Sequence, residues 1–192
     1  MFKKKNIMHR GKHTVVTAIE ILKQKAEGGQ ARLGDFTLTD TAFYINFDAN
    51  GLGGKFNLVD SKTRQVVGVT NIDGEKFAAG KDVVIDAISL KCGFGLSIDS
   101  ADYSDNFGID ARVKNAEIRI NQGKNVLLNL PVTEIIANEN TIEIFKRALT
   151  TPILIKSNQL FEIQIELPKN QSITNLPNVF FRLEMTATQA KR

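Results

Sequence analysis

A run of basic side chains near the start of the sequence could bind phosphate groups. Residues 1–13 contain no acidic side chain and five basic ones, namely Lys3, Lys4, Lys5, Arg10 and Lys12. Such a segment can attach a protein to nucleic acid or to an anionic membrane surface through charge. A solvated terminal tail is the alternative. We predict a flexible basic arm over residues 1–13 and regard these five side chains as candidate contacts to nucleic acid or an anionic surface.

The rest of the chain carries no such excess of positive charge. The whole sequence has 25 basic and 21 acidic residues, and setting aside the five basic residues of the arm leaves 20 against 21. Removing Lys191 and Arg192 as well leaves 18 basic against 21 acidic residues, so the body is mildly acidic and both ends are basic. Any attraction to phosphate is predicted to belong to the ends of the chain rather than to a face of the fold.

Both histidines of the chain, His9 and His13, also lie in the arm. Their spacing would place them on one face of a helix, as in zinc proteases, but those enzymes need a glutamate directly after the first histidine, and Arg10 stands there. We therefore predict no metal site.

Residues 14–192 contain no histidine, which leaves carboxylates as the obvious groups for general acid–base catalysis. We predict that the chain is not an enzyme and uses no cofactor.

Four aspartates fall close together in one polar segment. They are Asp99, Asp102, Asp105 and Asp110. Such oxygen ligands suit a calcium ion, but the alternating ligand spacing and the closing glutamate of an EF-hand are missing. A solvated loop beside a sheet edge explains them better.

The single cysteine, Cys92, stands among apolar residues and is predicted to be a small buried side chain rather than a nucleophile.

One long helix is predicted, over residues 14–27. Its apolar residues recur at helical spacing, Thr14 can cap the first turn and Gly28 can end the last one. The apolar stripe includes Val15, Val16, Ile19 and Leu22. This stripe can pack on the body of the same chain, dock on a neighbouring subunit or lie on a membrane. We regard these four residues as candidate subunit contacts.

After Gly34 the sequence changes to short apolar segments separated by glycine, asparagine and aspartate. About ten strands are predicted, over residues 42–47, 55–60, 64–70, 82–91, 108–120, 124–130, 141–149, 152–156, 159–167 and 179–187. Strands without intervening helices exclude a parallel βαβ fold. We predict an all-β protein: a single jelly-roll sandwich over residues 35–188, preceded by the basic arm (1–13) and one N-terminal amphipathic helix (14–28).

Two stretches resemble parts of a known family of viral shell proteins. The first runs from Val66 to Ile88 and reads as a strand, a turn at Asp73 and a second strand. The second begins at Pro152 and continues to a closing strand that ends near Met185. Both are similar to the capsid-protein jelly rolls of tailless icosahedral bacteriophages. Some members of that family are double jelly rolls, which need about sixteen strands, so the strand count favours a single roll here.

The resemblance implies a structural subunit of a phage capsid, located in the virion, whose β body binds copies of itself and other virion proteins. The arm and the helix would then contact neighbouring subunits, the genome or an internal membrane, and no small-molecule substrate is expected. Whether the subunit is a coat, vertex or minor shell protein stays open. Two alternatives also stay open: a carbohydrate-binding β-sandwich module, which the absence of tryptophan disfavours, and a subunit of an adhesion appendage.

Overall fold

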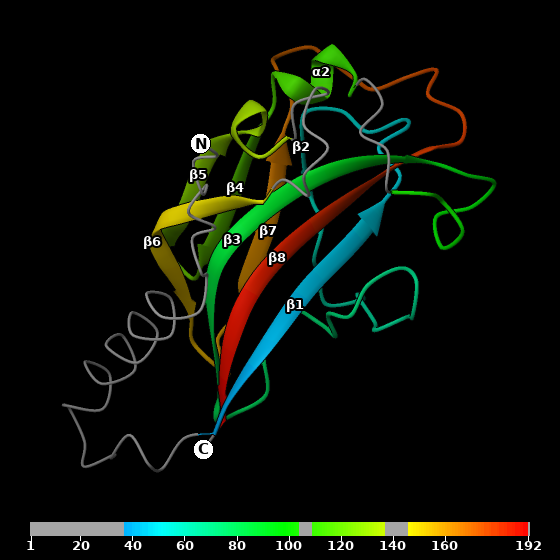
Figure 1. The fold of residues 1–192 in the computed structure, drawn as a ribbon. Coiled ribbons are helices and arrows are strands. Elements are labelled where there is room, and N and C mark those ends of the chain that lie inside the picture. Colours follow the sequence, from blue (N-terminus) through cyan, green and yellow to red (C-terminus); the bar gives the residue numbers. More distant parts are fainter. Residues whose placement is uncertain (1–36, 104–108, 137–145, 192) are drawn as a thin grey trace, which may run out of the picture.

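The computed structural model describes residues 37–103, 109–136 and 146–191. Within these ranges the chain forms two antiparallel sheets of four strands each, packed as two layers (Figure 1). The prediction of an all-β sandwich is confirmed. The basic arm and the helix predicted over residues 14–27 lie outside the described residues, and so does every candidate residue assigned to them.

The first sheet has the strand order β1-β8-β3-β6. Its members are β1 (Thr37–Phe47), β8 (Val179–Lys191), β3 (Lys81–Phe94) and β6 (Arg147–Ile155). The first three cross the molecule as long curved strands, drawn in blue, red and green in Figure 1. β8 pairs with both of its neighbours from Phe181 to Lys191. It therefore lies between β1 and β3 along most of its length.

The second sheet has the strand order β2-β7-β4-β5. Its members are β2 (Lys55–Asn57), β7 (Phe161–Glu166), β4 (Glu117–Gln122) and β5 (Asn125–Pro131). Two short helical turns flank it, α2 (Ala111–Lys114) before β4 and the 3-10 helix η2 (Val132–Glu134) after β5. Within the described ranges, no helix has the length and apolar character needed to cross a membrane.

Alternation along the strands builds the core. On β8, Phe181, Leu183 and Met185 are buried between the sheets, whereas Arg182 and Glu184 alternate with them and face outward. The inward side chains of the two sheets form one apolar cluster. Its removal from water is the main force that holds the layers together, and the alternation leaves the outer face free for polar side chains.

The strand predicted over residues 64–70 is wrong. A tight turn replaces it, closed by a hydrogen bond from the amide of Val69 to the carbonyl of Val66. Gly68 has a φ of +86°, in the left-handed region that glycine adopts without steric cost. The chain then runs beside the outer edge of β1, where the amide of Asn46 donates to the carbonyl of Val69 at 2.8 Å. The segment therefore protects part of a sheet edge instead of extending a sheet.

The strand predicted over residues 108–120 is wrong in its first half. Residues Ala111–Lys114 form α2, and strand pairing begins only at Glu117. The side chain of Asp110 accepts a hydrogen bond from the amide of Arg112 at 2.8 Å and so caps the first turn of the helix. A local capping interaction therefore outweighs the strand-like alternation of this segment.

The strands predicted over residues 141–149 and 152–156 form one strand, β6, in the part of the chain that the structure describes. Pro152 lies inside β6 without ending it. β6 stands at the edge of its sheet, and its pairing with β3 shifts register between Ile85 and Ala87. Both features accommodate a residue that has no N–H group to donate. The described residues contain eight strands, fewer than the ten predicted.

Candidate functional site

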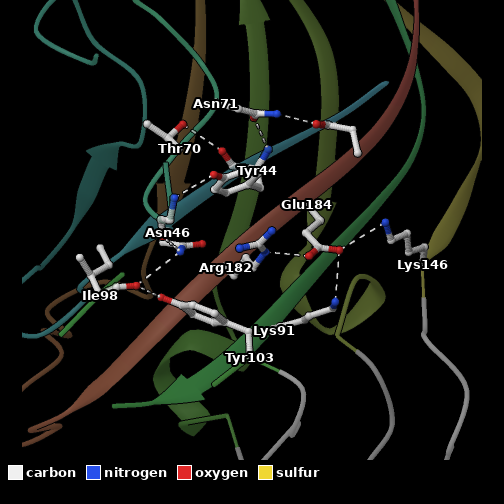
Figure 2. A network of polar contacts seen from close by, with 12 residues as sticks. Tyr44, Asn46, Thr70, Asn71, Lys91, Ile98, Tyr103, Lys146, Arg182 and Glu184 are labelled. Atoms are coloured by element: carbon white, nitrogen blue, oxygen red, sulfur yellow. Dashed lines mark hydrogen bonds and ion pairs between the residues drawn. The ribbon is translucent and has the colours of Figure 1, made fainter. Parts of the chain in front are cut away.

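A network of polar side chains covers part of the outer face of the first sheet (Figure 2). It forms where outward-facing residues of three adjacent strands stand in register. Lys91 of β3 and Asn46 of β1 lie on either side of Arg182 of β8, and Tyr44 of β1 lies beside Glu184. Strand pairing alone thus brings together side chains that are far apart in the sequence.

Glu184 is the centre of the network. Its Oε1 accepts a hydrogen bond from Nε of Arg182 at 2.7 Å, and its Oε2 lies 3.2 Å from Nζ of Lys91 and 3.3 Å from Nζ of Lys146. Lys146 comes from the segment directly before β6, so Figure 2 shows cations reaching one carboxylate from three different parts of the chain. The Glu184 side chain is only 14% exposed, which shields these contacts from water.

The cations around Glu184 decide its ionisation. Burial is the largest single effect, and it favours the neutral acid. The hydrogen bond from Arg182 and the charges of Lys91 and Lys146 act in the opposite direction, and together they hold the pKa of Glu184 below its ordinary value. Glu184 is therefore ionised at neutral pH. Among the described residues, the side chains of Arg182, Lys91 and Lys146 contact this single carboxylate, so this cationic cluster has three positive charges to one negative charge.

Arg182 also lies between the two tyrosines of the chain. Its guanidinium carbon is 4.1 Å from the ring centre of Tyr44 and 5.7 Å from that of Tyr103. A guanidinium over the face of an aromatic ring is attracted by the electrons of the ring. Burial raises the pKa of Tyr103 to about 12, so its hydroxyl stays protonated and donates to the carbonyl of Ile98 at 2.7 Å. Aromatic packing thus fixes the orientation of Arg182.

Two loops are tied to the sheet around these rings. The side-chain amide of Asn46 donates to the carbonyl of Gly68 at 2.6 Å and to the carbonyl of Ile98 at 3.4 Å, so one side chain joins both loops. The amide of Gly68 donates to the hydroxyl oxygen of Tyr44 at 3.1 Å. The hydroxyl of Thr70 donates to the carbonyl of Tyr44 at 2.9 Å. The tip of the first loop, residues 66–70, and the second loop, residues 96–103, therefore adjoin each other at this end of the sheet.

Two glycines let the second loop approach β3 closely. A Cβ atom on Gly95 would lie 2.5 Å from the Cα of Ala101, and one on Gly93 would lie 2.7 Å from both the carbonyl oxygen of Asp102 and the ring of Tyr103. These distances are shorter than any side chain could tolerate without displacing the loop. The close approach places Tyr103 against Arg182.

The network has the chemistry of a binding site for negative charge. Cys92 is buried, as predicted, and burial raises the pKa of its thiol to about 11, which keeps it protonated and unreactive at neutral pH. Among the residues that the structure describes, no three metal-ligating side chains gather into a possible metal site. The cationic side chains of the cluster, oriented by tyrosines, can attract and hold an anion.

The aspartates singled out in the sequence do not form one site. Asp99 accepts a hydrogen bond from the hydroxyl of Ser97, which lowers the pKa of Asp99. Asp110 caps α2, and its ion pair with Arg112 likewise lowers its pKa. Asp105 lies outside the described residues. Asp99 and Asp110 thus serve separate local turns.

Arg182, Lys91 and Lys146 were not predicted as site residues from the sequence. They belong to three different segments, and the mildly acidic overall charge of the body hides their convergence. One signal was present: Arg182 and Glu184 occupy the outward positions of an alternating strand, which makes them neighbours on one face. Their partners across the sheet depend on the pairing of distant strands, which the local pattern does not specify.

Comparisons of the chain with protein-family models, with curated proteins and with solved structures give no match. Function is therefore inferred from the strand order and from the geometry of the surface.

Proposed function

We propose that the chain is a structural subunit of a bacteriophage capsid, built as a single jelly roll that assembles with copies of itself. The strand order supports this proposal most directly. β1 pairs with β8, β2 with β7, β3 with β6 and β4 with β5, and all four pairs are antiparallel. Nested pairs of this kind arise when a ribbon of paired strands is rolled into two sheets, as in a jelly roll, and viral capsid proteins are a major class with that topology.

The resemblance in the sequence adds partial support. Its second stretch, from Pro152 to Met185, covers the last part of β6, all of β7 and the first half of β8, which are strands as the resemblance requires. Its first stretch was expected to open with a strand at Val66, and that strand is a turn. Fold alone does not determine function, so the surface of the molecule also has to suit assembly.

The surface suits protein contact better than carbohydrate stacking. Sugar-binding sites present exposed aromatic rings, above all tryptophan, and the sequence contains no tryptophan. Its two tyrosines, Tyr44 and Tyr103, flank Arg182 and are partly buried. They are therefore engaged in holding loops on the sheet, which disfavours the carbohydrate-binding alternative.

Apolar side chains are exposed on the two adjoining loops. Val67 is 89% exposed at the tip of the first loop, and Leu96 is 93% exposed in the second. Val66 beside Val67 is 50% exposed. The loops adjoin each other, since Asn46 bonds to both and Gly68 lies against Asp99. Apolar side chains that gather in this way usually mark a protein contact.

A second copy of the chain is the partner that fits this surface. The first loop carries the exposed cations Lys62 and Arg64 shortly before its apolar tip, and the second carries the exposed carboxylate Asp99 shortly after Leu96. Because Lys62 lies close to the exposed carboxylate of Asp60, Arg64 supplies the net positive charge of the first loop. About a two-fold axis between the two loops, Arg64 would face Asp99 of the second copy. Apolar contact at Val67 and Leu96 would add to this attraction.

The N-terminal segments complete the proposal. The stripe formed by Val15, Val16, Ile19 and Leu22 is proposed to contact neighbouring subunits. The basic arm is proposed to contact the genome or an internal membrane through Lys3, Lys4, Lys5, Arg10 and Lys12. Other virion proteins are proposed as further partners, and the virion as the location of the chain.

Sedimentation velocity and negative-stain microscopy on the purified chain test the proposal. We expect oligomers or closed particles whose formation depends on protein concentration. Replacing Val67→Ser or Leu96→Ser is expected to weaken association by about tenfold or more, because each change removes apolar contact area from a two-fold interface. Val126→Ser is the matched control, since Val126 is 62% exposed on β5 of the other sheet.

Two results would contradict the proposal. A chain that sediments as a monomer at every concentration and salt level, alone and with nucleic acid, would exclude self-assembly. Association that Val126→Ser weakens as much as Leu96→Ser would place the contact elsewhere on the body.

A further inference from the structure

Among the described residues, the cationic cluster of Arg182, Lys91 and Lys146 carries three positive charges, and Glu184 is the one carboxylate that the three contact. Arg182 and Lys91 stand directly opposite each other on paired strands, an arrangement of like charges that destabilises a sheet. Lys146 brings a third positive charge to the same oxygen that Lys91 contacts. One carboxylate neutralises only one of these charges. Such a local excess is expected where the missing negative charge comes from a ligand.

The three cations are also accessible enough to meet a ligand. The side chains of Lys91 and Lys146 are each 21% exposed, and that of Arg182 is 24% exposed. They are shielded from bulk water, which strengthens their attraction for an anion, yet none is sealed inside the core. The cluster therefore combines partial desolvation with an opening to solvent.

Hydrogen-bond donors remain available at the cluster. Arg182 uses its Nε atom for Glu184, and within the described part of the chain its two terminal nitrogens have no hydrogen-bond partner. Each ammonium group has three N–H donors, and Glu184 occupies one from each lysine. Next to Glu184 across the strand pair, the buried hydroxyl of Ser89 has no partner either. Several donors thus surround a place where positive charge is in excess.

We infer that Arg182, Lys91 and Lys146 form a binding site for a phosphate group. A phosphate carries up to two negative charges, matching the difference between the three positive charges and the one negative charge of the described cluster, and its several oxygens can accept hydrogen bonds from a guanidinium and two ammonium groups at once. Two sources present this chemistry, the backbone of a nucleic acid and a free phosphate ion or small phosphate ester. The inference does not depend on self-assembly, since it concerns a single subunit.

Binding of inorganic phosphate to the full chain tests the inference. The melting temperature and the amide NMR spectrum are followed while phosphate replaces chloride at constant ionic strength. We expect a rise in melting temperature and shifts centred on β3 and β8. Lys146→Gln is expected to weaken phosphate binding by about tenfold or more, because one charged hydrogen bond is lost. Lys124→Gln, at an exposed turn between β4 and β5, is the matched control and should bind as the unmodified chain does.

Glu184→Gln should change the affinity for phosphate in the opposite direction from Lys146→Gln. Removing the negative charge of Glu184 should tighten phosphate binding several-fold, provided that circular dichroism shows the variant to be folded, because the ligand no longer competes with a carboxylate. A cluster with a purely structural role would not produce this gain. The position of the NMR shifts, on β3 and β8 rather than in residues 1–13, separates the cluster from the arm.

A single-stranded oligonucleotide distinguishes the two sources of phosphate. If Lys146→Gln weakens oligonucleotide binding, measured by fluorescence anisotropy, as well as phosphate binding, the ligand is a nucleic-acid backbone. If it weakens only phosphate binding, the ligand is a free or small phosphate. The inference is overturned if phosphate acts no differently from chloride, or if Lys124→Gln weakens binding as much as Lys146→Gln.

Discussion

The guanidinium of Arg182 lies over the ring of Tyr44, with its central carbon 4.1 Å from the ring centre. The same tyrosine accepts a hydrogen bond at its hydroxyl from the amide of Gly68. One side chain thus links the cationic cluster on the sheet to the tip of the loop that carries Val67. Loop position and cluster geometry are coupled through this ring.

Replacing Tyr44 should loosen both features. Tyr44→Leu removes the ring and the hydroxyl, and we expect a loss of unfolding free energy of about 1–3 kcal/mol. Tyr44→Phe keeps the ring and should cost about 1 kcal/mol or less, because only the hydrogen bond from Gly68 is lost. Urea denaturation of the two variants measures both values. Equal losses would show that the contact between the ring and Arg182 contributes nothing to stability.

Gly95 should not accept a side chain. In Gly95→Ala the new Cβ would meet the Cα of Ala101 at 2.5 Å, so the loop would have to move away, at a cost of about 1–3 kcal/mol. Gly123→Ala is the control, because Gly123 has a φ of +60° but no atom within 4 Å of an added Cβ. It should lose only about 1 kcal/mol through backbone strain. Thermal unfolding compares the variants, and a smaller loss for Gly95→Ala would contradict the close approach.

Glu184 should make the free energy of unfolding depend on pH. Its pKa is lower in the folded protein than its ordinary value of 4.5, so its contribution is complete above that value and is lost as the pH falls through the lower folded pKa. In Glu184→Gln we expect a loss of about 1–3 kcal/mol at pH 7, because three partly buried cations lose their counter-charge. Below the folded pKa the curves of variant and unmodified chain should converge. Glu162→Gln, at an exposed position on β7, is the control for general charge effects.

Deleting residues 1–13 should leave the melting temperature nearly unchanged, because a flexible arm contributes little buried area. If the arm binds nucleic acid, the deletion should also remove most of the salt-sensitive retention on heparin. Any retention left should come from the folded body, and Lys146→Gln tests whether the cationic cluster contributes to it. A deletion that unfolds the protein would show that the segment belongs to the folded body.

Local sequence patterns predicted strands well where one face of the strand is buried and the other is more exposed to solvent. The strands predicted over residues 159–167 and 179–187 correspond to β7 and β8. The pattern failed at Val66 and Val67, because apolar side chains on an exposed turn look like part of a strand until the left-handed Gly68 is known. Apolar composition reports burial only when the chain conformation is already known.

The cationic cluster could not be predicted in the same way. Lys91 and Arg182 become neighbours only because β3 pairs with β8, and Lys146 joins them from the segment before β6. A sequence pattern specifies which face a side chain occupies, but not which strand lies beside it. The acidic segment was the opposite case. Its aspartates are close in sequence, yet Asp99 and Asp110 serve separate turns.

The pairing of β1 with β8 joins Thr37 to Lys191 and so links the two ends of the described chain. Contacts between such distant segments require large loops to close before they yield any stabilisation. A chain that depends on them should fold slowly, over milliseconds to seconds, and only after β8 has left the ribosome. Until then β1 and β3 each lack the neighbour that lies between them, so the nascent chain presents unpaired strands to other nascent copies. Its yield in a cell should therefore depend on chaperones and on the rate of synthesis as much as on the stability of the finished sandwich.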